Sequence, residues 1–260
     1  MAEFVLYNAP QSTCSQRVRY TLNAKGAPFE EVKLDLFAGD QLKPDYLAIN
    51  PNGVVPTLLH DGRPVIDSAV IMEYLDEIDH AVPLVPDDPV ERARMRAMIR
   101  YIDEVPTPAV RVPSYNLAFL PHFQAMSEAE FQALCDSKPL RREFLMKMGR
   151  TGFPKAEMDE ALGRLDRAVT RMAEWLDQSG GPWLMGERLT LADIAIMPVI
   201  VRMADIDLET SWADKPAVAR WFDALRQTPA FATTYYFGAL LTEKYPHLAE
   251  RRVARAMSAR

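Results

Sequence analysis

A serine and a cysteine lie two residues apart where the sequence predicts the start of its first helix. Ser12 lies just before that helix, and Cys14 lies at its opening. The first N–H groups of a helix are unpaired and form its positive dipole end, so this position favours an anion, which the Ser12 hydroxyl would help to hold. A cysteine at a helix N-terminus can be nucleophilic. Both residues are therefore candidates for chemistry, and the structural alternatives are an N-cap serine and a small buried cysteine.

Two later segments could bind a small ligand through backbone groups. Pro56 interrupts the strand predicted at 54–60, where proline cannot donate to the ladder, so we expect it at the strand's first residue with a cis peptide bond. Such a turn leaves the backbone N–H and C=O of Val55 free to pair with an extended peptide. Asp67 and Ser68 begin a helix, whose N–H groups suit a carboxylate.

The elements that position these residues are expected within the first 81 residues. Apolar patterns, turns and caps predict, in chain order, a strand at 2–8, a helix at 15–25, a strand at 29–36, an irregular helix or loop at 38–45, a strand at 54–60, a hairpin turn at Asp61-Gly62, a strand at 63–66 and a helix from Asp67-Ser68 to Ile78. The strand–helix–strand unit implies a parallel pair and the hairpin implies an antiparallel pair, so we expect a mixed four-stranded sheet. The apolar face of the last helix is predicted at Val70, Ile71, Tyr74, Leu75 and Ile78.

From residue 82 the strand patterns stop and helical patterns take over. A proline-punctuated linker is followed by helices predicted at 88–105, from Ser127, at 159–178, from Thr190 and at 216–228. The Ser127/Glu130 and Thr190/Asp193 pairs have the spacing of capping boxes. Because the helix after Thr190 is apolar nearly all round, it should form the core of an all-helical second part.

The segment 106–126 contains four prolines, which make it too irregular for one straight helix. Together with the end of the preceding helix, it has aromatic and basic side chains that would suit the wall of a substrate pocket. The candidates for that wall are Tyr101, Arg111, Tyr115 and Phe119, and the alternative is a loose aromatic surface loop.

Composition excludes several classes of protein. Hydrophobic residues make up 48% of the 260 residues and charged residues 25%, which is ordinary for a globular chain. A net charge of −6 disfavours nucleic-acid binding, and no apolar run is long enough to cross a membrane. Residues 1–20 lack a signal-peptide pattern, and the two cysteines make neither a disulfide framework nor a metal site, so we expect a cytoplasmic protein. The arginine-rich tail after Glu250 is expected to be a frayed basic terminus.

The chain resembles the glutathione transferases at four motifs. These are Ser12–Ser15, similar to the Ser-x-Cys signature of the zeta class (the maleylacetoacetate isomerases); Asn50–Leu58, similar to the segment around the family's cis-proline; Asp67–Leu75, similar to the clamp for the γ-glutamyl group of glutathione; and the Thr190–Asp193 capping box. The resemblance implies a thioredoxin-like glutathione-binding domain at residues 1–81 and an all-α substrate-binding domain at residues 88–260.

The resemblance also implies roles for the candidate residues. Ser12 would stabilise the thiolate of glutathione, and Cys14 is the alternative, because a matching cysteine resolves a mixed disulfide in related dehalogenases. Tyr7 matches a structural tyrosine in the classes that use serine. The residues expected to bind glutathione are Val55, Pro56, Asp67 and Ser68, with Gln41, Lys43 and Asn52 as candidates for its glycine carboxylate.

A long second domain and the Asp67-Ser68 pair are similar to bacterial glutathione-dependent β-aryl etherases of lignin breakdown. The resemblance therefore implies a transferase that attacks a hydrophobic or aromatic electrophile with the glutathione thiolate. Among the reactions of this kind, it favours β-aryl ether cleavage. The alternatives are a maleylacetoacetate-type isomerase, for which Arg100 and Arg111 are available, a chlorohydroquinone reductive dehalogenase, or a glutathione-binding partner subunit. A homodimer is expected, or a heterodimer with a paralogue.

Overall fold

The computed structural model describes residues 4–79 and 81–250 of the chain. The start of the strand expected at 2–8 and the basic tail with Arg251, Arg252, Arg255 and Arg260 lie outside the described residues. The first part of the chain contains a four-stranded sheet of β1 (Phe4–Asn8), β2 (Phe29–Lys33), β3 (Thr57–His60) and β4 (Arg63–Ile66) in the order β2-β1-β3-β4. β1 pairs in parallel with β2, and the other two pairs are antiparallel. The mixed four-stranded sheet predicted from the sequence is therefore confirmed.

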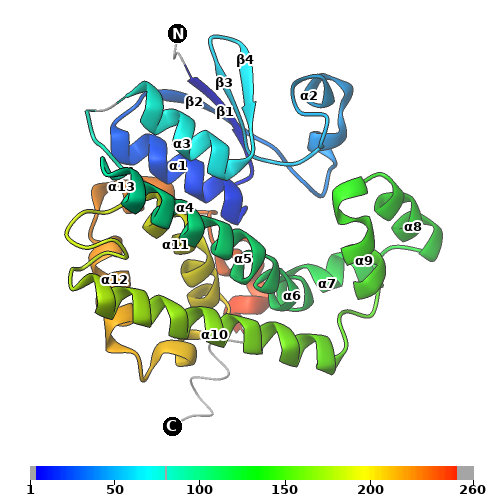
Figure 1. The fold of residues 1–260 in the computed structure, drawn as a ribbon. Coiled ribbons are helices and arrows are strands. Elements are labelled where there is room, and N and C mark those ends of the chain that lie inside the picture. The colour runs from blue at the N-terminus through cyan, green and yellow to red at the C-terminus, as the bar shows by residue number, and fades with distance from the viewer. Residues whose placement is uncertain (1–3, 80, 251–260) are drawn as a thin grey trace.

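Three helices accompany this sheet: α1 (Thr13–Lys25), α2 (Pro44–Ile49) and α3 (Ser68–Ile78). In Figure 1, α1 and α3 lie between the sheet and the helices of the second part. α1 begins two residues earlier than expected, because the Ser12 side chain accepts a hydrogen bond from the Ser15 N–H and so caps the helix at Thr13. Gly26 ends it in the left-handed conformation, as predicted.

The buried face of α3 differs from the prediction. Val70 and Ile78 are 55% and 43% exposed, whereas Met72 and Asp76 are buried. Asp76 is buried because its carboxylate accepts a hydrogen bond from Lys25 Nζ at 2.9 Å, a partner from another helix that the apolar pattern of α3 does not reveal.

The second part is all-helical. Its longer helices are α4 (Pro89–Glu104), α8 (Glu128–Asp136), α9 (Arg142–Met148), α10 (Lys155–Ser179), α11 (Leu191–Asp205), α12 (Pro216–Arg226) and α13 (Pro229–Thr234), and the shorter ones are α5 (Pro106–Ala109), α6 (Arg111–Ser114), α7 (Leu120–Gln124) and α14 (Leu241–Lys244). The proline-rich segment forms α5, α6, a π-helical turn at Tyr115–Phe119 and α7, so it is not one straight helix. Among the described residues, no helix is long and apolar enough to cross a membrane.

Helix α11 is the core of the second part, as its composition predicts, and it packs against α1 of the sheet domain. The two parts are also joined by the buried Arg17 of α1. Its guanidinium donates to the Ala195 carbonyl and the Thr107 hydroxyl, each at 2.9 Å, and pairs with Asp103. These contacts fix the end of α1 that carries Ser12 against the helices that face it.

Candidate active site

A cavity of about 200 Å³ lies between the sheet domain and the helical domain, at the N-terminus of α1. It brings together eight of the residues singled out from the sequence, namely Ser12, Cys14, Gln41, Asn52, Val55, Arg111, Tyr115 and Phe119. Segments from both parts of the chain form its wall, so the cavity exists only because the two parts are packed together.

Ser12 presents a hydroxyl to this cavity. Its Oγ accepts a hydrogen bond from the Ser15 N–H at 3.3 Å, and within the described residues the hydroxyl donates to no partner. The backbone N–H groups of Thr13 and Cys14, the first of α1, also have no acceptor among the described residues. The helix end therefore offers a hydroxyl and two N–H donors to an anion. The Cys14 side chain is half-buried and lines the same cavity.

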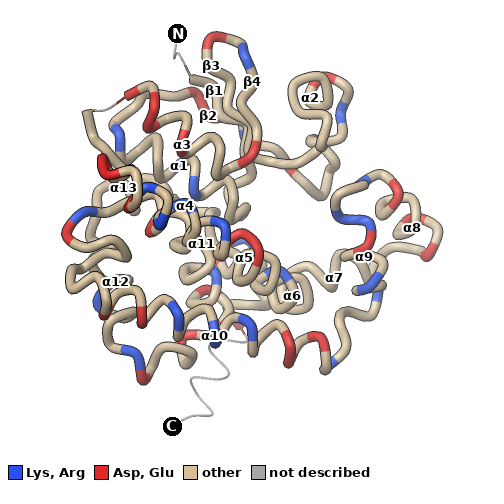
Figure 2. The backbone as a smooth tube through the Cα atoms, viewed as in Figure 1, with Lys and Arg blue, Asp and Glu red and all other residues tan. Residues whose placement is uncertain are grey.

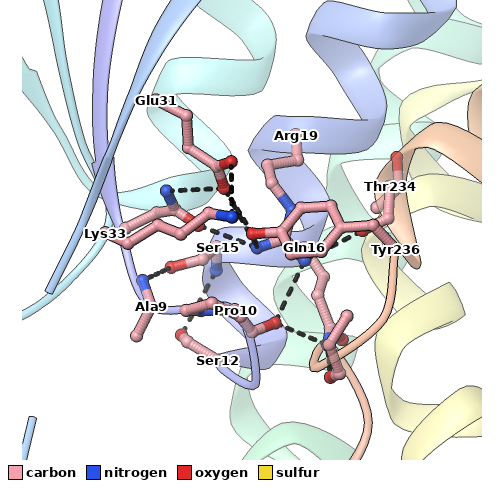
Figure 3. Close-up of polar contacts among 12 residues, drawn as sticks. Ala9, Pro10, Ser12, Ser15, Gln16, Arg19, Glu31, Lys33, Thr234 and Tyr236 are labelled. Atoms are coloured by element: carbon pink, nitrogen blue, oxygen red, sulfur yellow. Dashed lines mark hydrogen bonds and ion pairs between the residues drawn. The ribbon is translucent and has the colours of Figure 1, made fainter. Parts of the chain in front are cut away.

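Side chains of α1 hold the loop that precedes Ser12 in place (Figure 3). The Pro10 carbonyl accepts hydrogen bonds from Arg19 Nη2 at 3.0 Å and Gln16 Nε2 at 3.1 Å, and the Ala9 N–H donates to Ser15 Oγ. Arg19 also donates to the Thr234 carbonyl at 3.0 Å, and its burial lowers the pKa of its guanidinium. The sequence feature that could have indicated these positioning residues is the pair Arg17 and Arg19 on α1, a helix that is buried along most of its length.

Val55 precedes β3, and the Val55–Pro56 peptide bond is cis, as predicted. β3 begins at Thr57, one residue later than expected, so Pro56 lies just outside the strand and does not itself line the cavity. The backbone N–H and C=O of Val55 have no hydrogen-bond partner among the described residues. They are available to pair with an extended ligand backbone.

Asp67 and Ser68 lie at the end of the β3–β4 hairpin that also carries Val55, because Thr57 pairs with Ile66. Asp67 Oδ1 caps α3 by accepting from the N–H groups of Ala69 and Val70, at 2.9 and 3.2 Å. Neither residue lines the cavity. A ligand that paired with Val55 would therefore extend out of the cavity along this hairpin to reach them.

Of the three candidates for the glycine carboxylate of glutathione, two line the cavity and one does not. Gln41 lines the cavity and is 4% exposed, and its Oε1 has no hydrogen-bond partner, so this buried amide can accept from an N–H group of the ligand but not from its carboxylate. Asn52 lines the cavity. Lys43 does not: its Nζ pairs with Asp40 at 2.7 Å on the surface, which raises the pKa of the Lys43 amine.

The helical domain supplies an aromatic wall. The Tyr115 ring stacks on Phe123 with 6.0 Å between ring centroids and meets Phe119 edge-on at 4.9 Å. Burial raises the pKa of Tyr115, so its hydroxyl stays protonated at neutral pH. Cavity residues that the sequence analysis missed include Phe37, Phe123, Lys138, Leu140, Arg141, Arg202, Lys244 and Tyr245.

Three sequence-based candidates lie elsewhere. Tyr101 packs against Trp175 at 5.6 Å between ring centroids, under the guanidinium of Arg171, and does not line this cavity. Arg100 is exposed on α4 and does not line the cavity. Tyr7 packs against Tyr46 and is also outside the cavity. Within residues 4–79 and 81–250, no group of three or more His, Cys, Asp or Glu side chains is placed to hold a metal ion.

The sheet domain with its cis-proline, packed against a helical domain across a shared cavity, is the architecture of a glutathione transferase. The family model for the N-terminal domain of glutathione S-transferases matches residues 11–78, and the model for the C-terminal domain matches residues 124–229. The chain belongs to the glutathione transferase family, and glutathione is its co-substrate. The family, the fold and the co-substrate predicted from the sequence are therefore confirmed.

The chain is similar to individual members of the family along most of its length. Protein LigF of Sphingobium sp. (strain NBRC 103272 / SYK-6) is 30% identical over 233 residues, which cover 86% of this chain and 90% of LigF. Maleylacetoacetate isomerase of Rhizobium meliloti (strain 1021) is 31% identical over 209 residues, covering 79% of this chain and 85% of the isomerase. The crystal structure of Beta-etherase LigF superposes with a TM-score of 0.80 at 27% identity, over 90% of this chain and 98% of that one.

Proposed function

We propose that this glutathione transferase cleaves β-aryl ethers by attack of the glutathione thiolate. The observation that carries the proposal is that the Ser12 end of α1 and the aromatic wall of Tyr115 and Phe119 line the same cavity. The similarity to a protein described as a β-etherase supports the same reaction.

Glutathione would bind along the sheet domain. Its cysteinyl backbone pairs with the free N–H and C=O of Val55 beside Pro56, and its γ-glutamyl end reaches the N-terminus of α3 at Asp67 and Ser68. Its glycine end lies towards Gln41 and Asn52, where the unpartnered Gln41 Oε1 can accept a hydrogen bond from the amide N–H of the glycine residue. This placement puts the sulfur near the hydroxyl of Ser12 and the first N–H groups of α1.

The reaction is a displacement. The thiolate sulfur attacks the carbon that bears the aryloxy group, a C–S bond forms, and the C–O bond breaks with its electron pair leaving on the aryloxide. The protonated Tyr115 hydroxyl lines the cavity and has no hydrogen-bond partner among the described residues, so it can donate to the leaving oxygen.

The direct test is glutathione-dependent release of guaiacol from a lignin-model β-guaiacyl ether with a ketone at the neighbouring carbon. The expected products are guaiacol and the glutathione thioether, in equal amounts. S-methylglutathione, which cannot form a thiolate, is the matched control and should release nothing. If unmodified glutathione released no guaiacol while the enzyme turned over maleylacetoacetate, the result would favour an isomerase. An isomerase is the second candidate function, and the similarity to the relative from Rhizobium meliloti supports it.

Asp67 is expected to pair with the ammonium group of glutathione. Asparagine retains the helix cap and tolerates the positive φ of 73° at this position, so Asp67→Asn removes the charge and little else. This variant should weaken glutathione binding by about 1–3 kcal/mol, measured by calorimetry.

Asp88→Asn is the matched control, because Asp88 caps α4 in the same way, by accepting from two backbone N–H groups at 2.9 Å each. It lies outside the proposed binding site and should leave the dissociation constant unchanged. Equal affinities for wild type and Asp67→Asn would remove Asp67 from the glutathione site.

We also infer that the enzyme acts as a homodimer in the cytoplasm. Val70 of α3 and Val90 of α4 are exposed apolar side chains, at 55% and 73%, on two helices that lie side by side with the Glu73–Arg96 ion pair between them. Sedimentation of the purified chain at twice the monomer mass is the expected result. A monomer that dimerises only with a paralogous chain would indicate the heterodimer instead.

A further inference from the structure

Of the charged residues in the described part of the chain, only basic ones line the cavity. Its charged lining residues are Arg111, Lys138, Arg141, Arg202 and Lys244. This differs from the chain as a whole, which has 30 Lys and Arg against 36 Asp and Glu. It also differs from helices such as α10 and α12, on which acidic and basic residues are interspersed (Figure 2). The electrostatic potential in the cavity therefore favours an anion.

Two of these five side chains hold the structure together. Arg202 donates to the Ser114 hydroxyl at 3.3 Å and to the Gln11 carbonyl, and Lys138 Nζ donates to the Leu36 carbonyl at 3.2 Å. Both link the helical domain to the sheet domain, and Arg202 also links α11 to α6. Their charges still contribute to the potential, but their donors are already used.

Arg111 is different because its guanidinium has no hydrogen bond or ion pair within the described residues, although the side chain is largely withdrawn from water. Burial lowers its pKa, and the nearby charge of Arg141 lowers it further. Among the described residues, the guanidinium of Arg141 donates only to the carbonyl of its neighbour Leu140, at 3.1 Å. A desolvated charge beside a like charge is unfavourable unless an anion compensates it.

The carboxylates of glutathione do not account for this pair. In the proposed binding mode they lie at the N-terminus of α3 and near Gln41 and Asn52, all in the sheet domain. Arg111 and Arg141 come from the helical domain, and Arg111 is on the same wall as the Tyr115 and Phe119 rings. The compensating anion therefore belongs to the second substrate, whose aromatic ring those side chains would contact.

We propose that Arg111 and Arg141 form an anion subsite that selects aromatic electrophiles bearing a carboxylate. The proposal rests on the proposed function for the position of glutathione, and it adds the class of the second substrate. A guanidinium can hold a carboxylate through two parallel hydrogen bonds, which fixes the orientation of the ring as well as its charge. The aromatic wall then places the ring over the sulfur of glutathione.

The test compares two unreactive probes of nearly the same shape, 4-phenoxybenzoate and 4-phenoxybenzamide. The enzyme is first saturated with S-methylglutathione, so that the carboxylates of the glutathione moiety already occupy their own sites. The binding of each probe is then measured by calorimetry near neutral pH. Wild type should bind the benzoate about 10- to 100-fold more tightly than the amide. Arg111→Gln should bind the two probes almost equally, and Arg141→Gln should lose part of the preference.

Arg100→Gln is the matched control, because it removes one positive charge from an exposed position outside the cavity. It should retain the preference of the wild type. Equal binding of the two probes by wild type, or a preference that survives in both Arg111→Gln and Arg141→Gln, would overturn the proposal.

Thermal stability gives a second readout. Since Arg111 has no partner to lose, Arg111→Gln should melt at or above the temperature of the wild type in the absence of ligand. A clearly lower melting temperature would show that the guanidinium serves the fold, and it would contradict the subsite. Failure of the ether assay is distinguishable from either outcome, because the probes bind without reacting.

Discussion

Replacing Ser12 by alanine is expected to lower kcat/KM for glutathione-dependent turnover about 10- to 1,000-fold, the loss seen when one oriented donor is removed from a charge-stabilising site. A free thiol with a pKa near 8.5 is mostly protonated at neutral pH, and the thiolate is the attacking species. The Ser12 hydroxyl has no protein acceptor among the described residues, so its proton is available to the sulfur. Ser12→Thr retains a hydroxyl and should retain much of the activity.

The pH profile separates this role from a structural one. If Ser12 stabilises the thiolate, the ultraviolet absorbance of glutathione thiolate bound to Ser12→Ala should appear at higher pH than in the wild-type complex. A merely structural cap would change the melting temperature and leave the titration of the bound thiol where it is. The two readouts are measured on the same samples.

Cys14 provides the contrasting variant, because it lines the same cavity two residues further along α1. For a simple displacement, Cys14→Ser should remain largely active. In a dehalogenase-type reaction Cys14 must release glutathione from a mixed disulfide, so Cys14→Ser would stop with a glutathionylated product. Cys135→Ser controls for loss of a thiol outside the cavity. A fast Ser12→Ala enzyme beside an inactive Cys14→Ser enzyme would falsify the assignment of Ser12.

Features with local causes could be predicted from the sequence. Asp61 and Gly62 both have the positive φ that a tight hairpin turn requires, and Gly26 adopts the left-handed conformation at the end of α1. The capping box at Ser127 has both of its reciprocal hydrogen bonds. In each case the residues that decide the conformation are within four positions of each other, so their spacing is sufficient evidence.

Features decided by distant partners could not be predicted. Lys138 reaches the Leu36 carbonyl across 102 positions of the chain, and Arg202 reaches Gln11 across 191. Tyr101 is aromatic and near the proline-rich segment, yet α10 covers it with Trp175. The basic lining of the cavity depends on which distant segments pack against each other, and no local sequence pattern predicts that packing.

Asp193 is the residue whose loss should most reduce stability. Its side chain is completely buried, and the carboxylate accepts four hydrogen bonds: from the N–H groups of Leu184 and Thr190 at 2.9 Å each, the Thr190 hydroxyl at 3.1 Å and Trp221 Nε1 at 2.8 Å. Burial raises the pKa of this carboxyl, and the four donors partly offset that rise. The predicted capping box is therefore also the junction of α11, α12 and the loop before α11.

Asp193→Ala leaves these donors buried without an acceptor, so we expect it to lower the free energy of unfolding by about 3–5 kcal/mol. The melting temperature should fall by roughly 10 °C, measured by circular dichroism. Asp166→Ala is the control, since Asp166 is exposed on α10, and its effect should stay within about 0.5 kcal/mol. Because Asp193 does not line the cavity, the folded variant should bind glutathione with the affinity of the wild type. If Asp193→Ala and Asp166→Ala melted at the same temperature, the four hydrogen bonds would contribute nothing to stability, and Asp193 would lose its place as the junction of the helical core.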